Sequence, residues 1–287
     1  MRWAPLLLLL VAAPASAQTE PLRARFPADL AVTAGALAVA GLATQLPVRG
    51  EPWARELLGV DEPVKQNFSP TAARWSDVLA GVTVLGPLAL QLRGGLDGAG
   101  GTRALIYGET IAANLALNGV TKALVGRPRP YSYNAAGRAE VERNPREAHL
   151  SFYSGHASTT FAAAVSGAWL FSQSSSDPVA RTAVWAGSLA LAGATSDLRV
   201  RAGKHFYSDV LVGAAVGAGV GVLVPALHLQ GQARPLLPAE WIAIGTAPLA
   251  GALMAQVLPL PERAPFQARA LPWVTGKVAG VMVAGAF

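Results

Sequence analysis

The sequence predicts an all-α protein built as a bundle of helices. Of its 287 residues, 52% are hydrophobic and 14% are charged, which is ample material for a large core. The apolar residues gather in segments of helical length, and glycine-, proline- or serine-rich turns at residues 94–101, 172–178 and 230–238 separate several of them. The predicted helices lie at about 30–48, 78–92, 104–125, 158–171, 182–195, 210–229 and 242–258.

The first 17 residues have the parts of a secretory signal. Arg2 supplies an early positive charge, residues 6–12 are apolar, and Ala15-Ser16-Ala17 offers a cleavage site before Gln18. We therefore expect residues 1–17 to be a signal peptide of an exported protein, with an uncleaved membrane anchor as the alternative.

Composition favours a multi-pass membrane protein. The charged fraction lies below the roughly 25% of a typical soluble domain, and the mean hydropathy is +0.36. However, the apolar segments are rich in alanine and glycine, and several are shorter than the about 20 residues of a membrane span, so a soluble core fits as well. The net charge of +6 favours anionic partners such as phospholipid headgroups, whereas the arginines form no stripe of the kind that binds nucleic acid.

The first polar motif, Lys122-x6-Arg129-Pro130, follows the segment 104–125. Arg129 stands between Pro128 and Pro130, which end a helix and hold the chain extended. A lysine and a planar guanidinium so placed can bind phosphate oxygens. The alternative is a cationic helix end that the helix dipole stabilises.

The second motif, Ser154-Gly155-His156, lies where the next helix should begin. Ser154 can cap that helix, and free backbone N–H groups there can bind an anion that Gly155 allows to approach closely. His156 could protonate a leaving oxygen. A capping serine beside an incidental histidine is the alternative.

The third motif, Arg199-x5-His205-x3-Asp209, precedes the apolar segment 210–229. On a helix, residues four apart share a face, so we expect the Asp209 carboxylate to fix the His205 tautomer and leave the other ring nitrogen as a nucleophile or base. Arg199 supplies a third cation. The alternative is an ordinary surface pair.

The helix order predicts that the three motifs meet. Two antiparallel helices joined by the turn at 172–178 place the second and third motifs at the same end, and the polar stretch 127–153 lets the first reach them. Within that stretch we expect residues 138–147 to be a solvated linker without a catalytic role.

These motifs resemble the signature of the type 2 phosphatidic acid phosphatase superfamily, which includes bacterial class A acid phosphatases and vanadium haloperoxidases. The superfamily pattern reads Lys-x6-Arg-Pro, Pro-Ser-Gly-His and Ser-Arg-x5-His-x3-Asp. The chain departs from it at Tyr153 and Leu198, where proline and serine are usual. The similarity covers residues 104–229, which we expect to form the catalytic core between an N-terminal helical region at 18–103 and a C-terminal helix with a short β tail at 230–287.

The resemblance implies a covalent phosphatase mechanism without metal or cofactor, inhibited by vanadate. His205 would attack phosphorus, Asp209 would orient it, and His156 would protonate the leaving alcohol. The residues implied to bind phosphate are Lys122, Arg129, Ser154, Gly155 and Arg199. The other two histidines, His149 and His228, have no carboxylate or histidine at ligand spacing in the sequence, so we expect no metal site.

Four functions are compatible with these residues. The first is a lipid-phosphate phosphatase in the bacterial inner membrane with its active site facing the periplasm. The others are a soluble periplasmic acid phosphatase of broad specificity, a vanadate-dependent haloperoxidase, and a membrane scaffold or phosphate sensor, although the last predicts loss of a catalytic residue and none is lost. Three spans before Lys122 would turn the site toward the cytoplasm whether or not the signal is cleaved. We therefore expect that one early segment, 78–92, does not span, or that none of the segments does.

Overall fold

A computed structural model describes residues 21–49, 57–93, 95–96, 98–257 and 259, and the backbone of 267–275 and 278–286. The predicted signal peptide at 1–17 lies outside the described residues.

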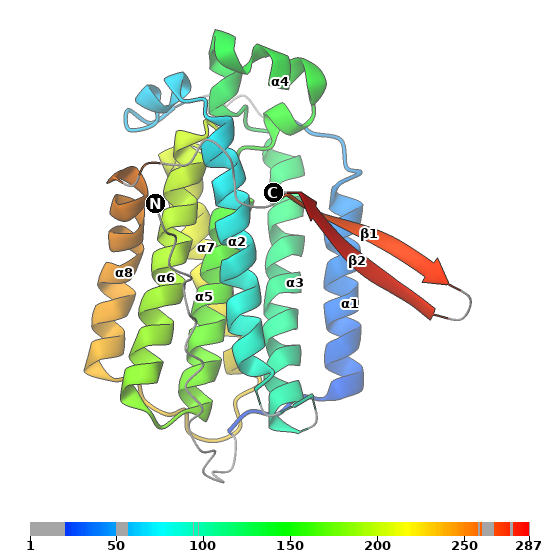
Figure 1. Ribbon diagram of the computed structural model, residues 1–287, viewed down its shortest axis with the longest axis vertical. Helices are drawn as coiled ribbons and strands as arrows, with labels where there is room; N and C mark the ends of the chain where they lie inside the picture. Colours follow the sequence, from blue (N-terminus) through cyan, green and yellow to red (C-terminus); the bar gives the residue numbers. More distant parts are fainter. Residues whose placement is uncertain are drawn as a thin grey trace.

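The prediction of an all-α bundle is confirmed, because long helices lie side by side along one axis (Figure 1). Successive long helices run in opposite directions. We call the end where α3 and α6 finish and α5 and α7 begin the site end, and the opposite end the far end. The long helices are α1 Phe26–Ala43, α2 Pro70–Gln91, α3 Ala99–Val125, α5 Gly155–Ser174, α6 Pro178–Arg201, α7 Tyr207–Leu227 and α8 Pro238–Val257.

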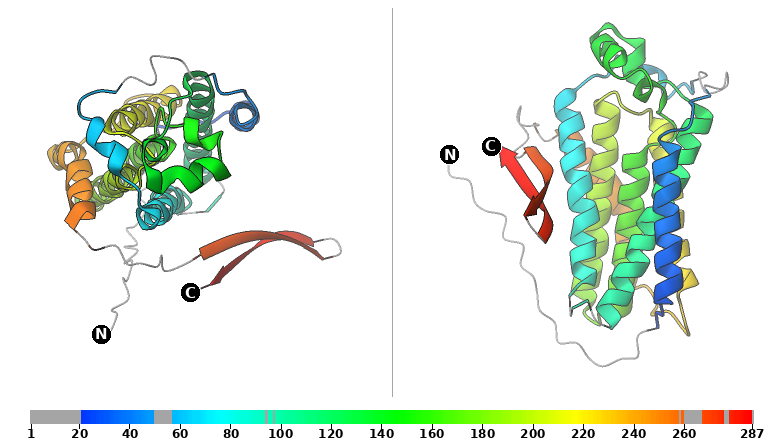
Figure 2. Two further views of the ribbon diagram at one scale, coloured as in Figure 1. Left: turned by 90° about the horizontal axis from the view of Figure 1, so that it is seen from above. Right: turned by 90° about the vertical axis from the view of Figure 1, so that its right-hand side faces the viewer.

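The segment between α3 and α5 forms short helices above the site end (Figure 1). Viewed along the helix axes, α1 and α8 lie at opposite edges of the bundle (Figure 2). The short elements between α3 and α5 are η3 Pro130–Tyr133, η4 Ala135–Gly137, α4 Arg138–Arg143 and η5 Glu147–His149, while η2 Glu62–Gln66 precedes α2.

Helix boundaries differ from the apolar segments where polar residues begin or end a helix. Residues 78–92 fall inside α2, which starts at Pro70 because Ser69 caps it by accepting the Ala72 N–H at 3.2 Å. Conversely, α1 ends at Ala43, ahead of Pro47, although the apolar pattern continues to residue 48. The segment 78–92, which we expected to be a short one that does not span, is thus part of the 22-residue helix α2.

Helices α5 and α7 contact each other backbone to backbone. A Cβ on Gly217 of α7 would lie 2.0 Å from the Ser158 carbonyl oxygen of α5, and one on Gly213 would lie 2.7 Å from the Ser154 carbonyl oxygen. Only glycine allows this approach, so the two helices that begin at the site end pack as a close pair.

The C-terminal residues form a hairpin. Strand β1 Gln267–Thr275 pairs antiparallel with β2 Val278–Ala286, with Gln267 opposite Ala286.

Candidate active site

All three motifs lie at the site end because each borders a helix terminus there. Lys122 is in the last turn of α3, which Gly126 ends with a left-handed φ of 61°. Ser154 caps α5, Arg199 is in the last turn of α6, and His205 directly precedes α7. The structure therefore brings together the residues that the sequence singles out.

His205 is buried, and its two ring nitrogens have different partners. Nδ1 lies 2.8 Å from the Ser151 carbonyl oxygen, which can only accept, so Nδ1 carries the proton. Nε2 then holds a lone pair, 3.3 Å from Nη1 of Arg129. The imidazole is thus fixed in the tautomer that a nucleophilic Nε2 requires.

The surroundings of His205 keep it neutral. Burial lowers its pKa well below the usual value, and the positive charges of Arg129, Lys122 and Arg199 lower it further. Since only the neutral ring has a lone pair, a neutral His205 is ready to attack an electrophile at any pH near neutrality.

Asp209 does not hydrogen-bond His205, contrary to the sequence prediction. Its Oδ2 lies 3.8 Å from Nδ1 because His205 precedes α7 and does not share its helical geometry. Oδ2 instead accepts the Phe206 N–H at 2.9 Å and the Ser151 hydroxyl at 2.5 Å. Asp209 therefore acts on His205 through Ser151, whose carbonyl fixes the ring.

A buried arginine that the sequence reasoning missed supports this arrangement. Arg127 pairs with Asp209 at 2.5 Å and with Asp61 at 3.0 Å, and both carboxylates are fully buried. Asp61 also accepts the Ser208 hydroxyl at 2.5 Å. The guanidinium stacks over the Phe206 ring at 4.4 Å. This network ties the residues around His205 to the segment before α2.

His156 is oriented by a carboxylate from α2. Its Nε2 donates to Oδ1 of Asp77 at 2.8 Å, and the same oxygen lies 3.4 Å from Nη1 of Arg199. Burial and the charges of Arg199 and Lys122 lower the pKa of His156, whereas the hydrogen bond to Asp77 opposes them. No sequence signal pointed to Asp77, which lies 79 positions from His156.

Two of the three predicted cations, Lys122 and Arg199, keep free donor capacity beside this pair of histidines. Lys122 donates to the Leu150 carbonyl oxygen at 3.0 Å and, among the described residues, has no carboxylate within ion-pair distance. Burial and the neighbouring Arg129 charge lower its pKa to about 7. In the described part of the chain, the buried Nε of Arg199 has no hydrogen-bond partner. Such donors favour a bound anion.

Arg129 is held from three directions. Its Nε donates to the Glu147 carbonyl oxygen at 2.9 Å, Nη1 donates to the Lys204 carbonyl oxygen at 2.8 Å, and Nη2 pairs with the Glu147 carboxylate. Lys204 in turn pairs with Glu140 at 3.1 Å. Most of residues 138–147 are exposed, as expected of a solvated segment, but the segment includes the short helix α4, and Glu147 contacts Arg129 directly.

Ser154 and Gly155 fix the start of α5. The Ser154 hydroxyl accepts the Ala157 N–H at 3.3 Å, as an N-cap does. A Cβ on Gly155 would lie 2.7 Å from Oδ1 of Asn118, so a larger residue there would displace the Asn118 amide of α3. Asn118 also donates to the Tyr153 carbonyl oxygen at 2.9 Å, which ties α3 to the turn before α5.

Comparison with known proteins agrees with this geometry. The family model of the PAP2 superfamily matches residues 103–232, a range that contains all three motifs. No curated protein and no solved structure matches the chain significantly.

Proposed function

We propose that this chain is a phosphatase of the PAP2 superfamily, whose family model matches residues 103–232, and that it cleaves phosphate esters through a phosphohistidine on His205. Nε2 of His205 attacks phosphorus and forms a P–N bond while the P–O bond to the alcohol breaks. His156 gives its proton to the departing alcohol oxygen. In the second step, water loses a proton to His156 and attacks phosphorus, which breaks the P–N bond and releases phosphate.

The observation that carries this proposal is the set of unpaired donors beside a neutral histidine. Lys122 without a described carboxylate partner and the unsatisfied Nε of Arg199 offer positive charge where negative charge builds on the phosphoryl oxygens. A bound phosphate would also raise the pKa of His156, since it counteracts the cations that lower it, and so make it a competent acid.

We further propose that the substrate is a lipid phosphate, because the outside of the bundle is apolar. Two helices, Phe26–Ala43 and Tyr207–Leu227, are long and apolar enough to cross a membrane. Only 6% and 33% of their respective apolar stretches are buried inside the bundle. Core helices of a soluble bundle would be mostly buried. Large apolar side chains also stand exposed on α8: Trp241, Ile242, Leu249, Leu253, Met254 and Val257. A surface of this kind supports contact with lipid.

In this proposal the site end faces the periplasm. Since α1 begins at the far end and α1, α2 and α3 alternate in direction, α1 then starts on the cytoplasmic side, and a signal cleaved before it would contradict this orientation. Reporter fusions after Gly95, between α2 and α3, and after Asn134, beyond α3, test it because one full helix separates the two positions. We expect cytoplasmic activity at Gly95 and periplasmic activity at Asn134. Periplasmic reports from both positions would favour a soluble bundle, and the reverse pattern would invert the orientation.

The activity is tested by phosphate release from phosphatidic acid, a polyprenyl diphosphate and a small aryl phosphate. We expect the wild type to release phosphate in a vanadate-sensitive reaction and to prefer a lipid. His205→Ala should lower kcat by about 10⁴-fold or more, as loss of a covalent nucleophile does. Full activity in that variant would exclude the phosphohistidine, whereas His149→Ala, an exposed histidine, should retain the wild-type rate.

A further inference from the structure

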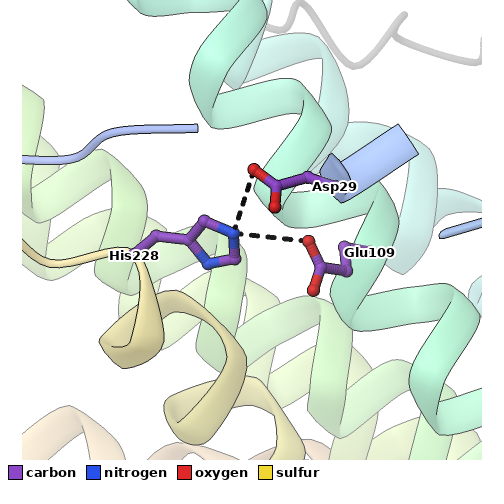
Figure 3. A group of neighbouring side chains, drawn as sticks. All are labelled: Asp29, Glu109 and His228. Atoms are coloured by element: carbon purple, nitrogen blue, oxygen red, sulfur yellow. Dashed lines mark ion pairs between the residues drawn. The ribbon is translucent and has the colours of Figure 1, made fainter. Parts of the chain in front are cut away.

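A second group of ionisable side chains meets at the far end of the bundle (Figure 3). His228 follows α7, Asp29 lies in the first turn of α1, and Glu109 comes from α3. The His228 Nε2 is 3.5 Å from Oδ2 of Asp29 and 3.4 Å from Oε2 of Glu109. His228 has no carboxylate at ligand spacing in the sequence, and the structure brings two to it from distant helices.

The tautomer of His228 directs a lone pair at the two carboxylates. Its Nδ1 lies 2.9 Å from the Val224 carbonyl oxygen and must donate to it. In the neutral ring, Nε2 is then an acceptor that faces two further acceptors. Three such atoms within 4.8 Å of one another repel unless a cation lies between them. Histidine ligands of metals usually donate their second N–H to a carbonyl or carboxylate in this way.

The distances favour a metal ion over hydrogen bonds. N–H···O bonds span about 2.7–3.2 Å, so 3.4 and 3.5 Å are too long. Two ligands of a tetrahedral zinc ion, each about 2.0–2.2 Å from the metal, lie roughly 3.3–3.6 Å apart. Neighbouring ligands of an octahedral magnesium ion would lie about 2.9 Å apart. Both distances from the His228 Nε2 fit the tetrahedral ion.

Glu109 gives an independent reason for a cation. The residue is only 9% exposed, and its Oε2, which points at His228, has no hydrogen-bond partner among the described residues. A buried carboxylate oxygen without a donor is costly. Asp29 is oriented as a ligand would be, since its Oδ2 accepts the Arg25 N–H at 2.6 Å.

The backbone around these side chains is already paired. The Arg23 N–H donates to the His228 carbonyl oxygen at 3.0 Å, and the Gln230 N–H donates to the Pro21 carbonyl oxygen at 2.6 Å. The chain that leads into α1 is thus fixed to the chain after α7, which holds Asp29, in the first turn of α1, near His228.

We propose that Asp29, Glu109 and His228 bind a zinc ion, with water as the fourth ligand, that fastens α1 and the end of α7 to α3. The 21 residues of α7 place this site about 30 Å from His205. It is therefore separate from the phosphate site and does not depend on the function proposed for it.

The test is zinc binding by the purified full-length protein after removal of metals. We expect one zinc per chain, a higher Tm with zinc, and the intense visible absorption of tetrahedral cobalt when Co²⁺ replaces it. Glu109→Gln and His228→Ala should each weaken zinc binding at least about 100-fold. His149→Ala is the matched control, because its Nδ1 also lies near the carbonyl oxygen four residues earlier, at 3.1 Å.

Equal zinc binding by the wild type and by the Glu109→Gln and His228→Ala variants, or no zinc binding by the wild type, would overturn the proposal. The three side chains would then be an imidazolium paired with two carboxylates. His156→Ala should still bind zinc; if it does not, the ion sits at the phosphate site. Glu109→Gln keeps the shape of the side chain, and its circular dichroism separates a lost ligand from a lost fold. If that variant unfolds, Asp29→Asn serves the same comparison.

Discussion

His205 and His228 lie at opposite ends of the bundle in the same tautomer but in opposite electrostatic surroundings. Each places Nδ1 within hydrogen-bonding distance of a backbone carbonyl oxygen and leaves Nε2 with a lone pair. At the site end Nε2 faces the Arg129 guanidinium, and at the far end it faces two carboxylates. Neighbouring charge therefore suits the His205 ring to the proposed attack on phosphorus and the His228 ring to the proposed binding of a cation.

Removing Arg127 should disrupt the site end most, because it would leave two buried carboxylates without a cation. We expect Arg127→Met to lower the free energy of unfolding by about 3–5 kcal/mol, measured by denaturant titration. Arg143→Met is the control, since that side chain is 67% exposed and its loss should change stability by less than about 0.5 kcal/mol. Equal effects of the two substitutions would show that the network around Asp209 is not structural.

A smaller change tests whether the cations at the site end act as a shaped clamp or only as charge. Arg199→Lys keeps the charge but removes Nε, the donor without a described partner. Since a planar guanidinium binds phosphate in a fixed geometry, we expect kcat/KM for an aryl phosphate to fall by about 10–100-fold. An unchanged kcat/KM would mean that charge alone suffices there, and the exposed Arg143→Lys should show that result.

The smallest effect should be a shift in pH dependence. Asp77 is the carboxylate that raises the pKa of His156 against burial and nearby cations. In Asp77→Asn only the lowering causes remain, so the pKa falls further and protonated His156 is lost at a lower pH. The alkaline limb of the kcat/KM profile should therefore move to lower pH. If the alkaline limb does not move, it reports the titration of a group other than His156. The control is Glu142→Gln, an exposed position at which the profile should stay unchanged.

The sequence predicted the fold and the meeting of the motifs because both depend on local information. Apolar segments and the turns between them set the order of antiparallel helices, and residues at helix ends such as Lys122 and Ser154 then share one end. Spacing within a motif did not set the contacts of Asp209, since His205 lies outside the helix that the i,i+4 argument assumed.

The partners that the sequence did not reveal come from distant parts of the chain. Asp77 and Asp61 reach the site from residues before α3, and Asp61 contacts Ser208 across 147 positions. Asp29 and Glu109 reach His228 in the same way. Each is a single charged residue without a local pattern, so only the packing of whole helices brings it to its partner.

The glycine contact between α5 and α7 has a mechanical consequence. Because Gly213 and Gly217 leave no space between the two backbones, the helices that carry His156 and follow His205 form one stiff piece. A substrate must therefore fit a surface that these two helices do not reshape on binding. The Arg129 guanidinium, whose Nε donates to the Glu147 carbonyl oxygen at 2.9 Å, keeps its alignment only while the segment before α5 also stays in place.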